Sequence, residues 1–355
     1  MAEAIAADLL EGFSGRMSYE IFDLFVDADL PVLRRAGQIY QSIVGRQQWL
    51  YNLGFKLSDW PGVMRPLSQM LFTLWRRKIE SFFDTIEADV VVVTHPLFVP
   101  SLTDLARRRL GLKFALVTVV TDIVTPHASW AWPGVDLCLV PTQEAFERLA
   151  NFGLASSMLS LAEFPVHPSF RAAGPSRRNA RRILGIDEDR FTVLVTGGGD
   201  GLGRLAPVVA TIESSIPEAQ ILMLAGHNEQ LYRVLFRSSA PSTRVYGHSK
   251  EMSCMMKSAD LVIGKAGPST MMEARAVGVP VILIDEVGRQ EKGNAAYAER
   301  NGMGWKCRDI SQLSTLVRKV AAGAVPSRAL SEAADRKGKD VADAILALFA
   351  PRTLG

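Results

Sequence analysis

The sequence predicts an α/β protein built from two doubly wound, Rossmann-like domains. Short apolar stretches alternate along the chain with segments whose apolar residues have helical spacing. Most of these stretches are runs of Val, Ile and Leu with little alternation, which is typical of strands buried on both faces of a parallel sheet. In chain order, the expected strands are 17–25, 88–95, 114–122, 135–142, 191–199, 219–226, 243–248, 259–267 and 279–286.

A segment rich in proline and arginine, 165–187, interrupts this pattern and marks a domain boundary. We therefore expect a first domain at about 1–168 and a second at about 185–335, followed by a helix and tail at 336–355. A chain of 355 residues, 48% of them hydrophobic, is long enough to bury two cores. Ligands of such sheets bind beyond the carboxyl ends of the strands, so two facing sheets predict an interdomain cleft.

The first domain is expected to be incomplete. A doubly wound domain normally opens with a strand and a glycine-rich turn, whereas this chain opens in a helix-like segment, AEAIAADLLEGF at 2–13. The first strand and its glycine-rich loop are therefore predicted to be missing.

The charge balance argues against a nucleic-acid partner. The 40 basic and 37 acidic residues give a formal charge of +3, so any basic patch must be local. The three cysteines lack the paired spacing of a disulfide framework or a zinc site. No apolar run reaches the roughly 18 residues of a membrane span, and no signal peptide begins the chain. We expect a cytoplasmic protein that does not cross a membrane.

Residues 49–75 combine large apolar side chains with basic ones. Such a mixture is typical of a segment that contacts an anionic membrane surface. The alternative is a pair of ordinary helices with core-facing aromatic residues and solvated ends, which composition alone favours. The apolar side chains are Trp49, Leu50, Tyr51, Phe55, Trp60, Phe72 and Trp75, and the basic ones are Arg65, Arg76, Arg77 and Lys78.

The stretch VLVTGGGDGLG at 193–203 places glycines after an expected strand and before an expected helix. Glycines allow close backbone approach, and a helix start offers unpaired N–H groups to a phosphate. Gly198 and Gly199 are the candidate contacts. A tight strand-to-helix turn also needs glycine without any ligand, so this signal is weak by itself.

A second turn, GKAGPSTMMEA at 264–274, repeats this order of parts. Hydroxyl and N–H groups at the start of its helix suit a diphosphate, and Glu273 falls on the same helical face, where a carboxylate can hold a ribose diol. The residues concerned are Lys265, Gly267, Ser269 and Thr270. The alternative is ordinary N-capping by Ser269 or Thr270, with Glu273 completing a capping box.

The segment RQEKGN at 289–294 follows the last expected strand by a few residues. It places Gln290, Glu291 and Asn294 near the carboxyl end of that strand. Amide and carboxylate side chains are the groups that the hydroxyls of a sugar ring require. A solvated loop is the alternative.

Taken in order, GGGDGLG, GHSKEM, KAGPSTMMEA and RQEKGN resemble the donor half of GT-B glycosyltransferases. The first domain extends the resemblance through VTHPLF, VTDIVTPHASWAWPGVDLCLVPT and FPVHPSF, which are similar to motifs of the monogalactosyldiacylglycerol synthase family. The resemblance covers about residues 1–308. It implies a GT-B fold and inverting transfer of galactose or glucose from a UDP-sugar to diacylglycerol or a related lipid. The protein would lie peripherally on the inner face of the cell membrane, in contact with anionic lipid.

The resemblance also implies roles for individual residues. Gly198, Gly199, Ser269 and Thr270 would bind the diphosphate, with Lys265 and Gly267 in the same segment as the last two. Glu273 would hold the ribose, and the sugar would be held by Gln290, Glu291 and Asn294. Gly247 and His248 would contact the edge of the uracil ring. Donors of this family need no chelated metal, and the sequence has no convincing Asp-x-Asp site. We expect no metal or other cofactor, because N–H groups at helix starts can stabilise the departing UDP.

The acceptor hydroxyl must lose its proton to a general base. Asp122, at the end of the expected strand 114–122, is the preferred candidate, followed by His95 and His127. Each has a structural alternative. Asp122 is also suited to cap the following turn, and either histidine is also suited to a purely structural role.

Three departures from the family pattern leave a second function open. The glycine-rich loop before the first helix, whose histidine is a favoured base in the family, is missing; His167 stands in place of an arginine, and Arg289 in place of a glycine. The alternative is a protein that binds a nucleotide sugar or a membrane with weak or lost transferase activity. A non-hydrolysing UDP-sugar epimerase shares the architecture, but we do not expect it to carry the aromatic, basic segment 49–75.

Overall fold

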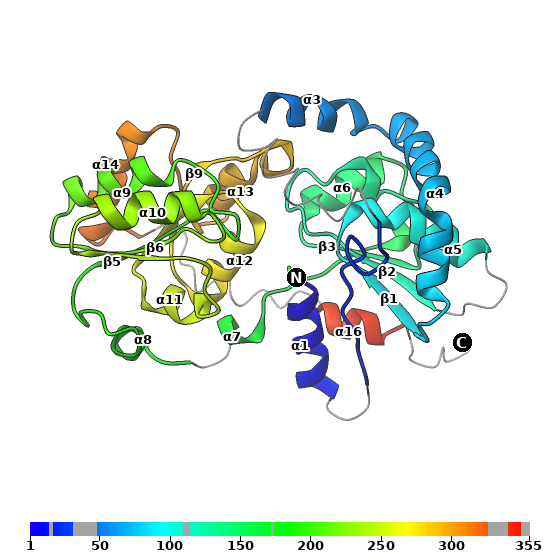
Figure 1. The fold of residues 1–355 in the computed structure, drawn as a ribbon, viewed down its shortest axis with the longest axis horizontal. Coiled ribbons are helices and arrows are strands. Elements are labelled where there is room, and N and C mark those ends of the chain that lie inside the picture. The colour runs from blue at the N-terminus through cyan, green and yellow to red at the C-terminus, as the bar shows by residue number, and fades with distance from the viewer. Residues whose placement is uncertain (14–16, 31–47, 109–113, 172–173, 326–339, 349–355) are drawn as a thin grey trace. The chain divides into compact units, whose positions relative to one another are not determined.

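The computed structural model describes residues 1–13, 17–30, 48–108, 114–171, 174–325 and 340–348, and the chain divides into two compact units (Figure 1). The first unit comprises 1–165, 288–290 and 337–355, and the second comprises 166–287 and 291–336. Within the described residues, no helix has both the length and the apolar character needed to cross a membrane.

The first unit is built on a four-stranded parallel sheet with the order β1-β2-β3-β4. Its strands are β1 (Val90–Val93), β2 (Ala115–Val119), β3 (Leu137–Val140) and β4 (Leu159–Leu161). Its helices are α1 (Ala2–Phe13), α3 (Gln48–Ser58), α4 (Pro61–Phe83), α5 (Val99–Arg108), α6 (Gln143–Asn151) and α16 (Val341–Leu346), with short 3-10 helices η2 (Pro96–Phe98), η3 (Ala128–Trp130) and η4 (Ser156–Met158).

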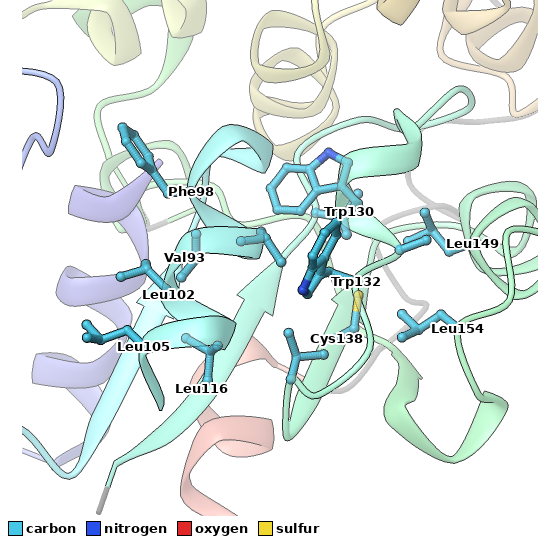
Figure 2. Close-up of a cluster of buried hydrophobic side chains, with 14 of the residues drawn as sticks. Val93, Phe98, Leu102, Leu105, Leu116, Trp130, Trp132, Cys138, Leu149 and Leu154 are labelled. Atoms are coloured by element: carbon cyan, nitrogen blue, oxygen red, sulfur yellow. The ribbon is translucent and has the colours of Figure 1, made fainter. Parts of the chain in front are cut away.

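Successive residues of a strand point to opposite sides of the sheet, so each face of this sheet carries apolar side chains that pack against helices. On one face, Leu116 and Cys138 pack with Leu102 and Leu105 of α5 and with Trp130, and Figure 2 shows this cluster. On the other face, alternate residues of β2 and β3 pack against α1 and α16; the cluster consists of Ile5, Val117, Val119, Leu139, Ala162, Val341, Ala344 and Ile345. The first and last described helices therefore share one core.

The expected strand at 17–25 is wrong. These residues form no strand, and the chain turns at 24–28. The Asp23 carboxylate accepts a hydrogen bond from Phe25 N at 3.0 Å, and the Asp27 carboxylate accepts one from Asp23 N at 2.6 Å. Short carboxylate side chains that bind nearby amides favour turns over strands, and this local preference outweighs the apolar pattern. Each of the other eight expected stretches contains an observed strand.

The second unit has a six-stranded parallel sheet with the order β10-β9-β8-β5-β6-β7. Its strands are β5 (Thr192–Thr196), β6 (Gln220–Leu224), β7 (Thr243–Tyr246), β8 (Leu261–Lys265), β9 (Val281–Asp285) and β10 (Gly304–Lys306). Its helices are α7 (Pro168–Arg171), α8 (Arg177–Ile183), α9 (Leu205–Ser215), α10 (Glu229–Ser238), α11 (Met252–Ser258), α12 (Pro268–Val277), α13 (Asn294–Arg300) and α14 (Ile310–Ala321), and η5 (Arg289–Glu291) precedes α13.

The centre of the second sheet is where the strand order reverses. Strand β5 pairs with β6 on one side and with β8 on the other, so the chain passes from one half of the sheet to the other across β5. Ligands of doubly wound sheets bind at such a switch point, beyond the carboxyl ends of the strands. The turns that follow β5 and β8 are therefore the expected place for a ligand.

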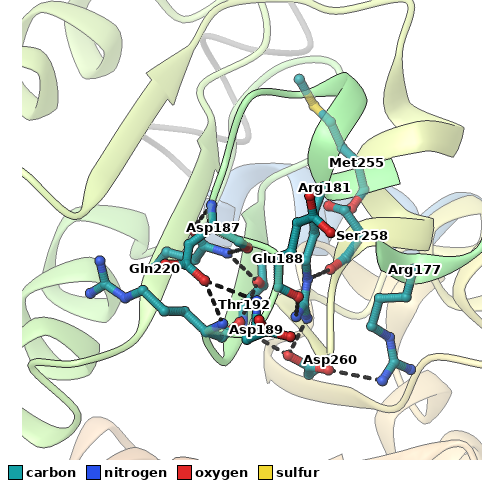
Figure 3. Close-up of polar contacts among 11 residues, drawn as sticks. Arg177, Arg181, Asp187, Glu188, Asp189, Thr192, Gln220, Met255, Ser258 and Asp260 are labelled. Carbon is teal, nitrogen blue, oxygen red and sulfur yellow. Dashed lines mark hydrogen bonds and ion pairs between the residues drawn. The ribbon is translucent and has the colours of Figure 1, made fainter. Parts of the chain in front are cut away.

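A buried ion pair holds the start of β5. Arg181 of α8 is 5% exposed and donates to Asp260 Oδ2 at 2.6 Å and to Ser258 O at 2.9 Å (Figure 3). Asp260 Oδ2 also accepts from Thr192 N, the first residue of β5, at 2.8 Å. The arginine-rich segment that suggested a domain boundary thus has a structural task in the second unit.

Two strands were missed, β4 (Leu159–Leu161) and β10 (Gly304–Lys306). Each has three residues and lies at an edge of its sheet. Short edge strands need less apolar character than central ones, so their sequences lack the uninterrupted runs of Val and Ile on which the prediction depended.

Candidate functional site

The turn after β5 requires its glycines. Gly198, Gly201 and Gly203 have φ of 72°, 58° and 103°, which other residues rarely adopt. A Cβ at Gly201 would lie 2.1 Å from Ala225 O, so the turn packs directly against the chain that follows β6. Gly199, by contrast, is exposed, and apart from its two neighbours in the chain no described residue has an atom within 4 Å of its Cβ position. Part of this turn is thus structural, while the backbone at Gly199 is accessible.

A carboxylate partly occupies the start of α9. Arg204 N donates to Asp285 Oδ2 at 3.0 Å, and the Arg204 guanidinium pairs with the same carboxylate at 3.0 Å. A negative group at a helix start satisfies the N–H groups that a phosphate would use. The sequence pattern did not predict this contact, because Asp285 stands at the end of β9, more than 80 residues from Arg204.

The start of α12 has no side-chain cap. Its N-cap residue is Gly267, and Pro268 opens the helix, so Ser269 and Thr270 are its second and third residues. The capping-box alternative is therefore wrong, because the N-cap residue has no side chain. N–H groups in the first turn lack partners within the helix. Ser269 is exposed and Thr270 is 8% exposed, which leaves an open helix start at the switch point.

Lys265 lies between the two turns. Its Cε is 3.5 Å from the Cβ position of Gly198, and its Nζ is 2.9 Å from that of Gly267. The Nζ group also forms an ion pair with Glu291 Oε1, and Glu291 Oε2 accepts from Val287 N at 2.9 Å. The glycine turn and the start of α12 thus meet around one ammonium group that Glu291 holds in place.

Two of the three predicted sugar contacts, Glu291 and Asn294, are buried, at 3% and 0% exposed. The solvated-loop alternative for 289–294 is therefore wrong. Asn294 Nδ2 donates to Ala266 O at 2.9 Å, while Asn294 Oδ1 has no hydrogen-bond partner in the described part of the chain. A buried acceptor without a partner is costly, and a hydroxyl donor from a ligand would satisfy it.

Glu273 lies half-buried on α12, one turn after Ser269 and Thr270. Burial raises the pKa of its carboxyl group from 4.5 to about 7. Its carboxylate makes no hydrogen bond to the described residues. Near neutral pH it can therefore change charge when a ligand binds.

Gly247 and His248 follow β7. The ring of His248 stacks on that of His227, with centroids 4.4 Å apart and planes at 15°, and both residues are exposed. His227 N donates to Gly199 O at 2.8 Å. The chain after β6 thus links the glycine turn to His248. Sequence reasoning missed His227, although its place directly after the expected strand 219–226 was a usable signal.

Gln290 is placed differently from Glu291 and Asn294. It belongs to the first unit, where its Oε1 accepts a hydrogen bond from Tyr51 Oη at 2.6 Å. Thr125 Oγ1 donates to the carbonyl oxygen of Gln290 at 3.0 Å. The segment RQEKGN is therefore divided: Gln290 lies with the first unit, while Glu291 and Asn294 lie with the second.

Asp122 follows the carboxyl end of β2. Its Oδ2 accepts a hydrogen bond from the indole Nε1 of the fully buried Trp130 at 2.8 Å. This contact orients the carboxylate and leaves the group half-buried rather than sealed in the core. A carboxylate held in this way is geometrically suited to accept a proton.

His127 has partners for both ring nitrogens. Its Nε2 lies 3.1 Å from Ser58 Oγ and its Nδ1 lies 2.8 Å from Ser129 Oγ. Burial, reinforced by the charge of Arg148, lowers the pKa of His127 to about 4. The structural alternative therefore describes this histidine better, since it holds α3 to the loop that follows β2.

His95 caps a short helix rather than facing a polar site. Its Nδ1 accepts from Leu97 N at 3.3 Å at the start of η2. Phe25 and Phe98 cover part of the ring, and this desolvation lowers its pKa. Of the three predicted bases, Asp122 thus retains the most suitable surroundings.

One group that the sequence did not suggest ties α3 and α4 to this loop. Asp59, between the two helices, accepts from Ala128 N at 3.1 Å and from Arg148 at 2.5 Å. The isolated acidic residue in a basic segment was the signal available for it.

Among the described residues, no three His, Cys, Asp or Glu side chains gather closely enough to hold a metal ion.

Two family models match the chain. Residues 1–166 match the monogalactosyldiacylglycerol synthase family, and residues 192–348 match the glycosyltransferase family 28 C-terminal domain. The first part of the chain is thus similar to the monogalactosyldiacylglycerol synthase family, and the second part is similar to the glycosyltransferase family 28 C-terminal domain. The region that matches the synthase family coincides with most of the first unit, and the region that matches the family 28 domain contains the turns after β5 and β8.

Individual relatives agree with this assignment. A probable chloroplastic monogalactosyldiacylglycerol synthase from Glycine max is 30% identical over 317 residues, which is 85% of this chain and 59% of the relative. The chain thus spans about three-fifths of the length of that synthase.

Solved structures show that the fold is GT-B-like. MurG from Acinetobacter baumannii has a TM-score of 0.54 at 16% identity, covering 78% of this chain and 77% of MurG. Anabaena Alr3699/HepE in complex with UDP-glucose has a TM-score of 0.52 at 14% identity, covering 74% of this chain and 78% of the other. The fold class expected from the motifs is confirmed.

Proposed function

We propose that this chain is an inverting hexosyltransferase that moves galactose from UDP-galactose to diacylglycerol or a closely related lipid. The synthase and family 28 domains support a glycosyltransferase with a lipid acceptor. The name of the Glycine max relative favours galactose over glucose. The observation that carries the proposal is the open start of α12 beside Lys265, because a helix start and an ammonium group together suit a diphosphate.

The second unit would bind the donor. The N–H groups of Ser269 and Thr270, with Lys265, would hold the diphosphate, and Glu273 would accept hydrogen bonds from the ribose hydroxyls. A sugar hydroxyl that donates to Asn294 Oδ1 would satisfy the one buried acceptor of this loop that lacks a described partner. Glu291 would act by positioning Lys265, since its two oxygens are bound to Lys265 and to Val287 N.

The first unit would bind the acceptor and supply the base. Asp122 would take the proton of the acceptor hydroxyl as that oxygen forms a bond to the anomeric carbon of the sugar. The bond from this carbon to the β-phosphate oxygen breaks at the same time, and UDP leaves with the electron pair. The charge that develops on UDP would fall on the start of α12 and on Lys265, so we propose transfer without a chelated metal.

A turnover assay tests this function directly. The full chain is incubated with radiolabelled UDP-galactose or UDP-glucose, vesicles that contain diacylglycerol, and either EDTA or Mg²⁺. We expect labelled lipid from UDP-galactose at equal rates with and without EDTA. Binding of UDP-galactose without any labelled lipid would overturn the transferase and support the nucleotide-sugar-binding alternative, while labelled lipid from UDP-glucose alone would overturn the choice of sugar.

A further inference from the structure

Strand β7 forms one edge of the six-stranded sheet, where β6 is its one partner among the described strands. Ile221 N donates to Ser242 O at 3.0 Å and Ala225 N donates to Tyr246 O at 2.9 Å, so Ser242 and Tyr246 turn their backbone groups toward β6. These groups alternate in direction along a strand, so the N–H and C=O groups of Val245 point away from β6. An outward donor and acceptor at a sheet edge can bind a further strand.

The sequence of β7 does little to prevent such pairing. Proteins commonly protect a sheet edge with lysine, proline or a β-bulge. Neither residue type occurs in β7, and its register with β6 runs without a shift. Its charged residue, Arg244, donates to Leu184 O at 2.9 Å, so the guanidinium is held by the chain that follows α8. The edge is therefore open to a partner.

A groove of about 430 Å³ lies beside this edge. It is lined by Thr243 and Val245 of β7, by Phe236 of α10 and by Ser239, which follows that helix. Phe236 is 67% exposed, and its ring stacks on that of Tyr232 with centroids 5.7 Å apart. Ser239 Oγ is buried and has no hydrogen-bond partner in the described part of the chain. An exposed aromatic ring beside an unsatisfied hydroxyl is typical of a surface that a protein partner covers.

We propose that β7 pairs in antiparallel orientation with β7 of a second copy of this chain, in a two-fold symmetric dimer. A hydrogen-bonded antiparallel pair exchanges the N–H and C=O groups of two facing residues, so Val245 would face the partner subunit's Val245. The same edge serves both subunits, and the assembly therefore closes at two copies. The inference goes beyond the proposed function and does not depend on it.

Helix α10 favours a second copy over an unrelated strand. It packs against β7, so a two-fold axis perpendicular to the sheet beside Val245 would place the α10 helices of the two subunits side by side and antiparallel. Glu229 opens this helix and Arg237 stands in its last turn, so opposite charges and opposite ends of the helix dipoles would face each other. Phe236 of each subunit would then enter the groove of the other, where its apolar surface leaves water.

Analytical ultracentrifugation of the full chain, at concentrations from about 1 to 100 µM, tests the proposal because dimer formation depends on concentration. Wild type is compared with Phe236→Glu, which would place two like charges in the interface, and with Val245→Pro, which removes the outward N–H. Proline is tolerated at an edge position whose N–H faces outward, so β7 should keep its pairing with β6. The matched control is Val234→Glu, since Val234 is a 51% exposed residue of α10 that does not line the groove.

We expect wild type and Val234→Glu to sediment with twice the mass of the 38.8 kDa chain. The dissociation constant of the dimer should rise by about 10-fold or more in Phe236→Glu and in Val245→Pro. Thermal unfolding at one common temperature would show that all four proteins keep their fold. A monomeric wild type, or an unchanged dissociation constant in either groove variant, would overturn the proposal. The measurement uses neither a nucleotide nor a lipid, so failure of the proposed function would leave its result unchanged.

Discussion

Lys265 at the end of β8 and Glu291 at the end of η5 form an ion pair whose side chains are 18% and 4% exposed. Because the pair is buried, removal of one partner leaves an uncompensated charge. We predict that Glu291→Ala lowers the free energy of unfolding by about 3 kcal/mol in urea denaturation. The double variant Lys265→Met/Glu291→Ala should recover part of this loss. A change below about 0.5 kcal/mol in the free energy of unfolding of the single variant would show that the pair does not stabilise the fold.

The raised pKa of Glu273 predicts a pH-dependent affinity for the donor. With a pKa of about 7, the carboxyl group is mostly protonated at pH 6 and mostly ionised at pH 8. Only the ionised form accepts hydrogen bonds from both ribose hydroxyls, so binding should lower this pKa and tighten as the pH rises. We expect UDP-galactose to bind about 10-fold more tightly at pH 8 than at pH 6.

UDP-galactose suits this measurement because its diphosphate has no terminal phosphate group that titrates near pH 6. Glu273→Gln should bind more weakly at pH 8 and show no change with pH. An equal pH dependence in wild type and Glu273→Gln would remove Glu273 from the ribose site.

The position of Asp122 predicts a kinetic defect without a binding defect. Asp122→Asn preserves an oxygen that can accept from Trp130 Nε1 but removes the basic group. We expect kcat to fall by roughly 10² to 10⁴, as for loss of a general base. UDP affinity should stay within a factor of two. His95→Gln serves as the comparison, and an equal loss of kcat in His95→Gln would contradict the choice of Asp122.

The low pKa of His127 predicts loss of stability in acid. The unfolded imidazole titrates near 6.5, whereas burial and Arg148 lower the folded-state pKa to about 4. Between these values the unfolded chain binds a proton that the folded chain does not, so stability is complete above pH 6.5 and is lost as the pH falls towards 4. Between pH 6.5 and pH 4, we expect the free energy of unfolding to fall by roughly 1–2 kcal/mol less in His127→Gln than in wild type. This difference is set below the full linkage value because the ring is partly exposed. Parallel stability curves for the two proteins would refute this assignment.

Central strands were predictable from sequence because their burial on two faces leaves an uninterrupted apolar run, as in β5 and β8. The failure at 17–25 has the opposite cause. There, Asp23 and Asp27 bind nearby amides, and such local contacts are not visible in an apolar pattern. The edge strands β4 and β10 were missed because short edge strands carry little of this signal.

The candidate site was predictable where it depends on chain order and not where it depends on contacts between distant residues. The start of α12 follows from Gly267 and Pro268, which are adjacent in the sequence. The pairing of Glu291 with Lys265, of Asp285 with Arg204 and of Gln290 with Tyr51 joins residues 26 to 239 positions apart. Such pairs arise only when folding brings distant segments of the chain together, so side-chain type alone could not assign them.

The proposed function depends most on a diphosphate held at the start of α12 by Lys265. Calorimetric titration of wild type and Lys265→Met with UDP and with uridine tests this point. We expect Lys265→Met to bind UDP 10- to 100-fold more weakly, about 1.4–2.7 kcal/mol, because a charged hydrogen bond is lost, and to bind uridine as wild type does. Equal UDP affinity in the two proteins, or an equal loss for UDP and uridine, would contradict the account.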